Sequence, residues 1–590
     1  MKNSAISALR KISLHNVFPF LTIVRITAVL IWMIYLCQHT DSLCSIYVLC
    51  TVCSLFFLLL RLFKRLPENR KSRFLFPAAS VVFGLAVCAA NYQDISSVLW
   101  FLLLWFGGFF TVDACLNGIF CFSEYIVKKR MFQTSLPSGR SARRLFLACF
   151  ALISLIDLAY LFLFRYPGCM NSDGIIQVTN GLYDIRANHF PYVHTLLLLS
   201  FLKAGLWISG GLNLGIAFYC CFQIFFLAFC FSFAIYTLYQ KGISKPFLVI
   251  VGICYVFMPY HIAYSCMVWK DVLYGGAVLL FITALYRIFC CMGRPWVNYA
   301  LLTAGGYGFA LFRNNGWYAL FLTFFLLLLL FYKKMKRTLL LLFLVLASTW
   351  LLTHPIYDML GVTPSEFTES LSIPVQQIAR VVADGGNITE QQAEAIDELI
   401  DYDSIPEKYD PDWADPIKFS VDHERLSEQK GRYFKLWVNI GLNNPVSYIK
   451  AWIDQTKGYW NGGYSFWIWY TTIDENWFDG YGSISQTIVF ERGARLVDYL
   501  MKLFMELPVF DVFRSIGFSI WLVGLCFLFF LKRKDYRGIV LTLPVIGTVL
   551  TLWIATPVFC EFRYAYAVFT CIPFLLVVAL HAQKCKNKEK

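Results

Sequence analysis

The sequence predicts an all-α polytopic membrane protein with about 14 transmembrane helices and one large, mainly helical extracytoplasmic domain. Of the 590 residues, 58% are hydrophobic and only 15% are charged, whereas a soluble protein has about 25% charged residues. Aromatic residues make up 18% of the chain, which is typical of helices that cross lipid and its two interfaces. Long apolar runs also alternate with short basic clusters, as expected for a chain that crosses a bilayer repeatedly.

Fourteen apolar runs are long enough to span a bilayer, which needs about 20 residues. Five come before the first long loop: 17–37, 46–63, 75–91, 98–122 and 145–164. Six follow that loop: 213–239, 246–264, 268–290, 296–312, 316–332 and 338–353. Three come near the end of the chain: 513–531, 538–556 and 564–580. No small-residue cleavage site follows the first run, so we expect a retained helix and not a signal peptide.

Lys and Arg gather on every second loop between these runs. The clusters lie at 2–11, 61–73, 128–144, 241–245, 287–294, 333–337 and 532–537 and in the Lys-rich tail. Because such residues favour cytoplasmic loops, we expect a plasma-membrane protein with both termini in the cytoplasm and residues 354–510 outside. Residues 191–210 would invert this pattern if they crossed the bilayer, so we expect them to lie at the outer interface or to re-enter the membrane.

These features divide the chain into four expected regions. Residues 1–144 form an N-terminal four-helix membrane region, and residues 145–353 form a seven-helix core with a long outer loop at 165–212. Residues 354–510 form the extracytoplasmic domain, in which we expect a helix over 375–382 and another capped by Thr389. Residues 511–590 contain three C-terminal helices and a basic cytoplasmic tail.

The charges and cysteines exclude some classes of partner. The segment 354–510 has 24 acidic and 12 basic residues, and the other basic residues are divided among short clusters. Nucleic-acid binding needs basic charge on one folded face, so we expect no nucleic-acid partner. Most of the 20 Cys lie in apolar runs, where a thiol acts as a small hydrophobe. We therefore expect neither a disulfide framework nor a structural metal.

Asp173 is the first candidate for chemistry. It lies in the loop after Phe164, among the turn-forming residues Asn171, Ser172 and Gly174. A carboxylate there could act as a general base and take a proton from an acceptor hydroxyl. The alternative is that Asp173 only makes an Asx turn or caps a helix.

The same loop continues through Asp184, His189 and His194. The two histidines could face one pocket. Two His with one or two Asp could also bind a divalent ion. A folded loop without a ligand would show the same spacing.

Three further outer sites carry charge where the positive-inside pattern predicts little. They are Lys270 with Asp271, Arg313 in the turn after 296–312, and Glu561 with Arg563. Arg and Lys bind phosphate through charge-assisted hydrogen bonds, so a lipid-linked phosphate is one ligand that fits Lys270, Arg313 and Arg563. The alternative is an ion pair within the protein, either Lys270 with Asp271 or Glu561 with Arg563.

Aromatic residues and glycines alternate between residues 459 and 481. Flat aromatic faces stack on sugar rings, so this segment is a candidate platform for a sugar or a lipid head group. An aromatic belt that seats the domain on the membrane is the other interpretation.

This order of elements resembles the GT-C membrane glycosyltransferases, which include the protein O-mannosyltransferases and the aminoarabinose transferases of lipid A. Five segments more narrowly resemble an uncharacterised family of membrane proteins from Gram-positive bacteria that is grouped with those enzymes. These are the segment from TyrProGly to Asp (166–173), HisPheProTyrValHisThr (189–195), TrpLysAsp (269–271), SerIleProValGlnGlnIleAlaArg (372–380) and GlyTyrTrp (458–460). The resemblance covers residues 145–580.

The resemblance implies transfer of a sugar, with inversion, from a polyprenyl-phosphate donor to a cell-envelope acceptor: a cell-wall polymer, a glycolipid or a protein. It implies Asp173 as the catalytic base, with Lys270, Arg313 and Arg563 on the donor phosphate. In the same scheme the acceptor is bound by Trp460, Tyr464, Trp467 and Trp469. It requires no cofactor. A divalent metal is compatible with the scheme but not needed, because Lys and Arg can neutralise the phosphate.

One departure from the family's pattern leaves the second acid open. Related enzymes often have two adjacent acids in the first outer loop, whereas Gly174 follows Asp173 here. Asp184 and Asp271 are therefore both candidates for the second acid, and Glu561 and the two histidines for supporting roles.

Two other functions share these features. A transporter or flippase of lipid-linked saccharides would also use outer aromatic residues and charges at membrane depth. However, transporters often contain internal repeats, and the two halves of this chain show no similarity. A polysaccharide ligase or polymerase would use the same class of donor, and the sequence does not separate it from a GT-C enzyme.

Overall fold

A computed structural model of the chain describes residues 22–34, 45–64, 74–129, 136–464, 468 and 476–581. Within these ranges nearly all regular structure is helical. The described residues contain one sheet, an antiparallel hairpin of β1 (Asn476–Phe478) and β2 (Gly482–Ile484) in which Trp477 pairs with Ser483. The protein is therefore an all-α membrane protein, as predicted.

Each of the fourteen predicted apolar runs overlaps a helix. The N-terminal helices are Thr22–Ile34, α2 (Ser45–Lys64), α3 (Leu75–Ala90) and α4 (Val98–Lys129). The central ones are α5 (Gly139–Phe164), α8 (Leu212–Gln240), α9 (Lys245–Phe257), α10 (Pro259–Ser265), α11 (Lys270–Phe289), α12 (Pro295–Leu311), α13 (Gly316–Phe331) and α14 (Lys336–Leu351). The C-terminal ones are α25 (Ile516–Arg533), α26 (Tyr536–Ala555) and α27 (Tyr566–His581).

Not all of these helices are long enough to cross a bilayer. Among the described residues, nine helices are long and apolar enough, or up to ten if the bent pair α9 and α10 is one span. Eight of the nine coincide with predicted runs, and the ninth is Tyr192–Ser209, in the loop between α5 and α8. The run predicted at 246–264 is broken between them, with a bend of 46°. Pro259 begins α10 and lacks the N–H that a continuous helix would need. The total of 14 crossings stays a prediction.

Two further helices lie in the loop between α5 and α8. α6 (Ser172–Leu182) is short, and α7 (Tyr192–Ser209) covers the segment that the sequence predicts to be interfacial or re-entrant. α7 packs closely along α8. The close approach depends on Gly205, because any side chain there would collide with the backbone of Gly215. α7 is also among the nine helices of membrane length, so its position relative to the bilayer stays a prediction.

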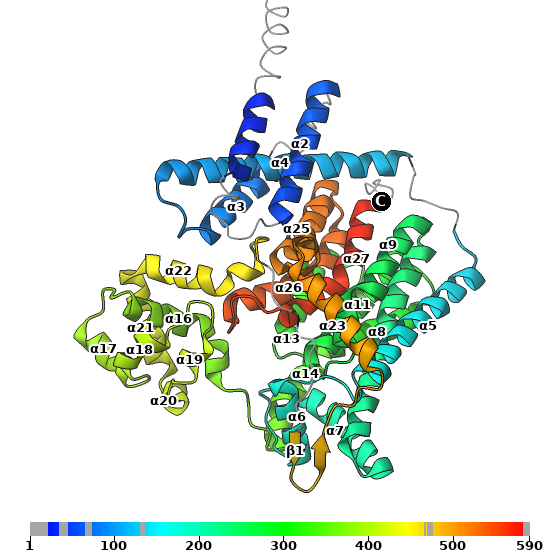
Figure 1. The fold of residues 1–590 in the computed structure, drawn as a ribbon, viewed down its shortest axis with the longest axis vertical. Coiled ribbons are helices and arrows are strands. Elements are labelled where there is room, and N and C mark those ends of the chain that lie inside the picture. The colour runs from blue at the N-terminus through cyan, green and yellow to red at the C-terminus, as the bar shows by residue number, and fades with distance from the viewer. Residues whose placement is uncertain are drawn as a thin grey trace, which may run out of the picture.

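α11 lies at the centre of the helical core and contacts α8, α12, α26 and α27 (Figure 1). Nearly all of its residues are buried, as expected for a helix that is apolar on every side. α12 approaches it closely at Gly305, where an added Cβ would lie 2.8 Å from the backbone N of Phe281. Because α11 is surrounded along its length, its first residues, Lys270 and Asp271, are enclosed by other segments at one end of the core.

Residues 372–456 form a separate helical lobe, drawn at the lower left of Figure 1. Its helices are α16 (Ser372–Ala383), α17 (Glu390–Asp397), α18 (Ile405–Lys408), α19 (Asp415–Lys418), α20 (His423–Glu428), α21 (Lys430–Asn443) and α22 (Pro445–Thr456). They enclose an apolar core of their own, which includes Val381, Ile405, Ile417 and Ile440. The predicted cap is confirmed, since Thr389 accepts a hydrogen bond from the backbone N–H of Gln392 at the start of α17.

The rest of the segment 354–510 returns to the helical core. The β1–β2 hairpin and α23 (Glu491–Glu506) pack on α5, α6 and α8. Tyr481 donates a hydrogen bond to the carbonyl of Leu182 (3.0 Å), and the Asn213 side chain bonds both the N–H and the C=O of Ser485. The expected extracytoplasmic domain thus consists of a lobe and a returning segment.

Candidate functional site

Six charged residues from four separate parts of the chain lie together at one end of the core. Asp173 comes from α6, Lys270 and Asp271 from the start of α11, Arg313 from the turn between α12 and α13, and Glu561 and Arg563 from the connection between α26 and α27. We call these six residues the charged cluster. It contains three cations and three carboxylates, all of which the sequence had singled out.

Asp173 and Arg563 form an ion pair, in which Arg563 Nη1 donates to Asp173 Oδ2. Asp173 does not cap α6, because Asn171 fills that role and accepts from the N–H of Gly174 (3.3 Å). The carboxylate of Asp173 is thus directed to the cluster. Burial opposes its ionisation, but Arg563 and Lys270 outweigh burial and lower the pKa of Asp173 below its usual value.

Arg563 is held between aromatic rings. Its guanidinium carbon lies 5.3 Å from the ring centre of Trp269 and 5.0 Å from that of Tyr564. Trp269 is itself fixed by a hydrogen bond from its Nε1 to Asn171 Oδ1 (2.6 Å). Such cation–π contacts suit Arg, whose planar group stacks on rings. Asn171, Trp269 and Tyr564 each adjoin a residue singled out above, but the sequence alone had not given them this role.

Arg313 and Asp271 form a second, deeply buried pair. Arg313 Nη1 lies 3.5 Å from Asp271 Oδ1, and the two residues are 8% and 2% exposed. Arg313 also donates to the backbone carbonyl of Tyr564 (2.6 Å). Neither carboxylate oxygen of Asp271 has a hydrogen-bond partner among the described residues. A buried carboxylate without donors is costly, so Asp271 is well suited to accept hydrogen bonds from a ligand.

Lys270 and Glu561 complete the cluster. The ammonium of Lys270 lies 4.8 Å from the ring centre of Phe190 and acts electrostatically on both Asp173 and Asp271. Glu561 Oε1 is 3.8 Å from Arg563 Nε. Burial raises the pKa of Glu561 to about 7, although Arg563 partly opposes the shift. The cluster can therefore gain or lose one proton near neutral pH.

The other residues of the predicted outer loop lie apart from this cluster or at its edge. Asp184 is exposed and pairs with Arg186 (2.8 Å). His194 is buried and shares a hydrogen bond with Tyr219 (2.7 Å). His189 packs on Phe190 and slightly lowers the pKa of Asp173. In the described part of the chain, no group of three His, Cys, Asp or Glu residues is arranged to hold a metal ion.

The predicted aromatic surface is only partly described. Trp460 is buried, with its ring stacked on Trp452 and its Nε1 donating to Thr456 Oγ1 (2.9 Å). Tyr464 is half-buried beside Lys457 and Phe559. Trp467 and Trp469 lie outside the described residues.

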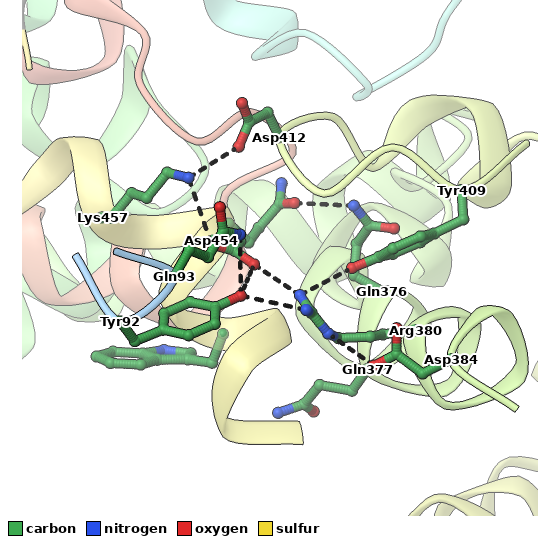
Figure 2. A network of polar contacts seen from close by, with 12 residues as sticks. Tyr92, Gln93, Gln376, Gln377, Arg380, Asp384, Tyr409, Asp412, Asp454 and Lys457 are labelled. Carbon is green, nitrogen blue, oxygen red and sulfur yellow. Dashed lines mark hydrogen bonds and ion pairs between the residues drawn. The ribbon is translucent and has the colours of Figure 1, made fainter. Parts of the chain in front are cut away.

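A second polar network, which the sequence had not indicated, connects the lobe to α3 (Figure 2). Arg380 donates to Asp454 (2.6 Å) and to the hydroxyl of Tyr92 (3.2 Å), which follows α3. Tyr92 in turn donates to the same Asp454 oxygen (2.8 Å). Lys457 lies within 3.5 Å of both Asp454 and Asp412. The buried Asp454 therefore has several donors.

The lobe also holds the segment that leads to Glu561 and Arg563. The N–H of Ala414 donates to the carbonyl of Pro557 (2.8 Å), and the N–H of Phe559 donates to the carbonyl of Asp412 (2.9 Å). The hydroxyl of the buried Tyr459 accepts from the N–H of Glu561 (3.1 Å). Contacts from the lobe and from Tyr459, which follows it, therefore help to position two members of the charged cluster.

The fold and this site define a class: an all-α, multi-pass membrane protein with a buried, charge-balanced cluster beside a helical lobe. The chain belongs to a family of unknown function (DUF6020), whose model matches residues 185–590. Five members of the cluster lie inside the matched range, and Asp173 lies before it. No curated protein and no solved structure matches the chain.

Proposed function

We propose that the protein is an integral-membrane glycosyltransferase that moves a sugar from a polyprenyl-phosphate donor to the hydroxyl of a cell-envelope acceptor, with inversion. One observation carries the proposal: Asp173 and three cations, distant in sequence, are gathered in one buried cluster. We place this enzyme in the plasma membrane with both termini in the cytoplasm and the lobe outside. Its acceptor is a cell-wall polymer, a glycolipid or a protein.

The cations Lys270, Arg313 and Arg563 would hold the donor phosphate. Arg binds phosphate with paired N–H donors, and such charge-assisted bonds are stronger than neutral ones. In the structure, the guanidinium of Arg313 faces Asp271 and that of Arg563 faces Asp173. The donor phosphate would displace the carboxylate from at least one of these two guanidinium groups. Protonation of Glu561, whose pKa is about 7, would offset the added negative charge.

Asp173 would act as the base. Its lowered pKa keeps the carboxylate ionised at neutral pH and therefore able to accept a proton. A phosphate bound to Arg563 would loosen the ion pair and turn Asp173 toward the acceptor. The proton of the acceptor hydroxyl passes to Asp173 while the oxygen forms a bond to the anomeric carbon.

The bond between the anomeric carbon and the phosphate oxygen breaks in the same step, and its electron pair leaves with polyprenyl phosphate. The fixed cations stabilise this leaving group, which is the electrostatic part of the rate gain. Asp271, whose carboxylate has no hydrogen-bond partner among the described residues, would accept hydrogen bonds from hydroxyls of the sugar. The scheme uses only side chains of the chain and its two substrates.

The test is sugar transfer by the purified protein from a panel of polyprenyl-phosphate sugars in the presence of cell-envelope acceptors. Loss of a positioned general base costs about 10²–10⁴-fold in rate, so Asp173→Asn should fall by that factor. Asp184→Asn, in the same loop but exposed and outside the cluster, should retain wild-type turnover. Equal turnover in all three proteins would contradict the role of Asp173. Flipping of donors in liposomes without transfer would favour a transporter instead.

A further inference from the structure

The residues of α23 divide into three stripes along the helix, at about 100° per residue. One stripe is buried: Gly493, Ala494, Met501, Phe504 and Met505. A second stripe is charged: Arg495, Asp498, Lys502 and Glu506. The third is mainly apolar and yet exposed, with Leu496, Tyr499 and Leu500 at 57%, 58% and 53% exposure. The exposed Arg492 lies at the N-terminal end of this third stripe.

The first two stripes fix the rotation of α23 on the protein. Asp498 forms an ion pair with the buried Arg165, the residue that ends α5. Met501 and Phe504 pack into the central apolar core, and a side chain on Gly493 would collide with Phe164. The stripe of Leu496, Tyr499 and Leu500 consequently faces away from the protein.

The segments next to α23 extend this exposed apolar surface. Val489 and Phe490 precede the helix, and Leu507, Val509 and Phe513 follow it, all of them exposed. The chain then enters α25, a helix of membrane length, at Ile516. On the other side, the exposed residues Phe162 and Leu163 belong to the end of α5, another helix of membrane length. The exposed stripe thus lies between the ends of two membrane helices.

We infer that α23 lies flat in the bilayer interface on the side of the molecule that carries the charged cluster. Leu496, Tyr499 and Leu500 enter the boundary of the acyl chains, and the charged stripe of Arg495 and Lys502 faces water and head groups. A helix with one apolar and one charged face binds membranes in this orientation. With 16 residues, six of them charged, α23 is too short and too polar to span.

Lipid explains the exposed stripe better than a protein partner does, because the apolar surfaces that continue it belong to membrane helices. The inference does not depend on the proposed enzyme activity. The position of α23 also sets the depth of the charged cluster in the membrane. Arg165, which pairs with Asp498 of α23, begins the loop that carries Asp173. The charged cluster then lies close to the level at which α23 meets the head groups.

Site-directed spin labelling of the full chain in liposomes tests this orientation. Single cysteines replace Leu496, Leu500, Arg495 or Lys502 in a background whose reactive native cysteines are removed, and each carries a nitroxide. Collision with oxygen reports lipid, and collision with a water-soluble nickel complex reports water. Two reference positions calibrate the scale: Leu155, exposed on the membrane helix α5, and Phe419, exposed on the lobe.

We expect Leu496→Cys and Leu500→Cys to resemble the Leu155→Cys reference in having oxygen collisions in excess, with a smaller excess because they lie nearer the head groups. Arg495→Cys and Lys502→Cys should match Phe419→Cys, with nickel collisions in excess. Nickel accessibility at the leucine positions would overturn the inference. So would protection of those positions from both reagents, which would show that a protein surface covers them. Where one leucine variant fails to fold, the other leucine and Tyr499→Cys carry the test.

Discussion

Asp173 and Arg563, which lie 390 positions apart in the chain, form an ion pair at the end of the helical core. The pair joins the long loop after α5 to the short connection between α26 and α27. The pair also favours the ionised form of Asp173, because Arg563 is a principal cause of the lowered pKa of this carboxyl group. Any function of the charged cluster will therefore depend on this contact.

Arg563→Gln should move the pH dependence of donor turnover. Removing the positive charge lets burial raise the pKa of Asp173, so the fall of kcat/KM at acid pH should begin at a higher pH than in wild type. The rate should also fall by about 10- to 150-fold, since a hydrogen bond to a charged group contributes about 1.5–3 kcal/mol. Arg186→Gln, which removes an exposed guanidinium, is the matched control. An unchanged acid limit in Arg563→Gln would argue that Asp173 is not the group that titrates.

Glu561→Gln should change how stability depends on pH. An ordinary Glu has a pKa of about 4.3 when unfolded, and that of Glu561 is about 7 in the fold. Between these values the folded state holds a proton that the unfolded state has lost, so wild-type stability falls as pH rises through this window. Glu561→Gln cannot titrate at this position, so its stability lacks this pH-dependent contribution. The Tm of both proteins is measured in detergent at pH 5, 6, 7 and 8. The Tm of the variant minus that of the wild type should increase as the pH rises. A constant difference would contradict the raised pKa.

Asp271→Asn should destabilise the fold more than the loss of one hydrogen bond would, because it leaves the guanidinium of Arg313 buried without its partner charge. Breaking a buried ion pair costs about 3–5 kcal/mol. The double variant Asp271→Asn/Arg313→Gln should recover part of that loss. A double-mutant cycle on thermal unfolding measures the coupling between the two residues, and strict additivity would contradict a direct interaction.

Tyr92→Phe should loosen the lobe from the N-terminal region. The substitution removes the hydroxyl that accepts from Arg380 and donates to Asp454 (Figure 2). Loss of one partner of a buried polar group costs about 1–3 kcal/mol. Limited proteolysis at the boundaries of the lobe should be faster than in wild type. Tyr536→Phe, at the exposed start of α26, should cleave at the wild-type rate.

The helices were predictable because hydropathy is a local property. All fourteen apolar runs overlap helices, since a buried backbone in an apolar segment satisfies its hydrogen bonds within a helix. Their lengths were less predictable. Pro259 divides one run into α9 and α10, and α3 and α13 are only 16 residues long.

The members of the charged cluster were also predictable, because a charge at the end of an apolar run is costly without a partner. Their partners were predictable only in part. The sequence offered Lys270 with Asp271 and Glu561 with Arg563, which are neighbours in the chain. Glu561 and Arg563 do pair, with 3.8 Å between Oε1 and Nε. The closer partner of Arg563 is Asp173, however, and Arg313 faces Asp271. Such pairs depend on how α6, α11 and α12 pack, which a single sequence does not reveal.

The aromatic run shows the same limit. Trp460 looked like part of a binding surface, but it is buried against Trp452. A sequence distinguishes an exposed aromatic ring from a buried one only when polar and apolar residues alternate with a regular period. Between residues 459 and 481 they follow no such period.

The contacts between the lobe and the segment before Arg563 have a consequence for variation within the family. The bonds from Ala414 to Pro557 and from Phe559 to Asp412 join main-chain atoms, so they survive almost any side-chain replacement at these four positions. Proline at 414 or 559 is the exception, because it has no N–H to donate. The side chains on the surface of the lobe can therefore diverge from one family member to the next, while these main-chain bonds keep the guanidinium of Arg563 in place beside Asp173.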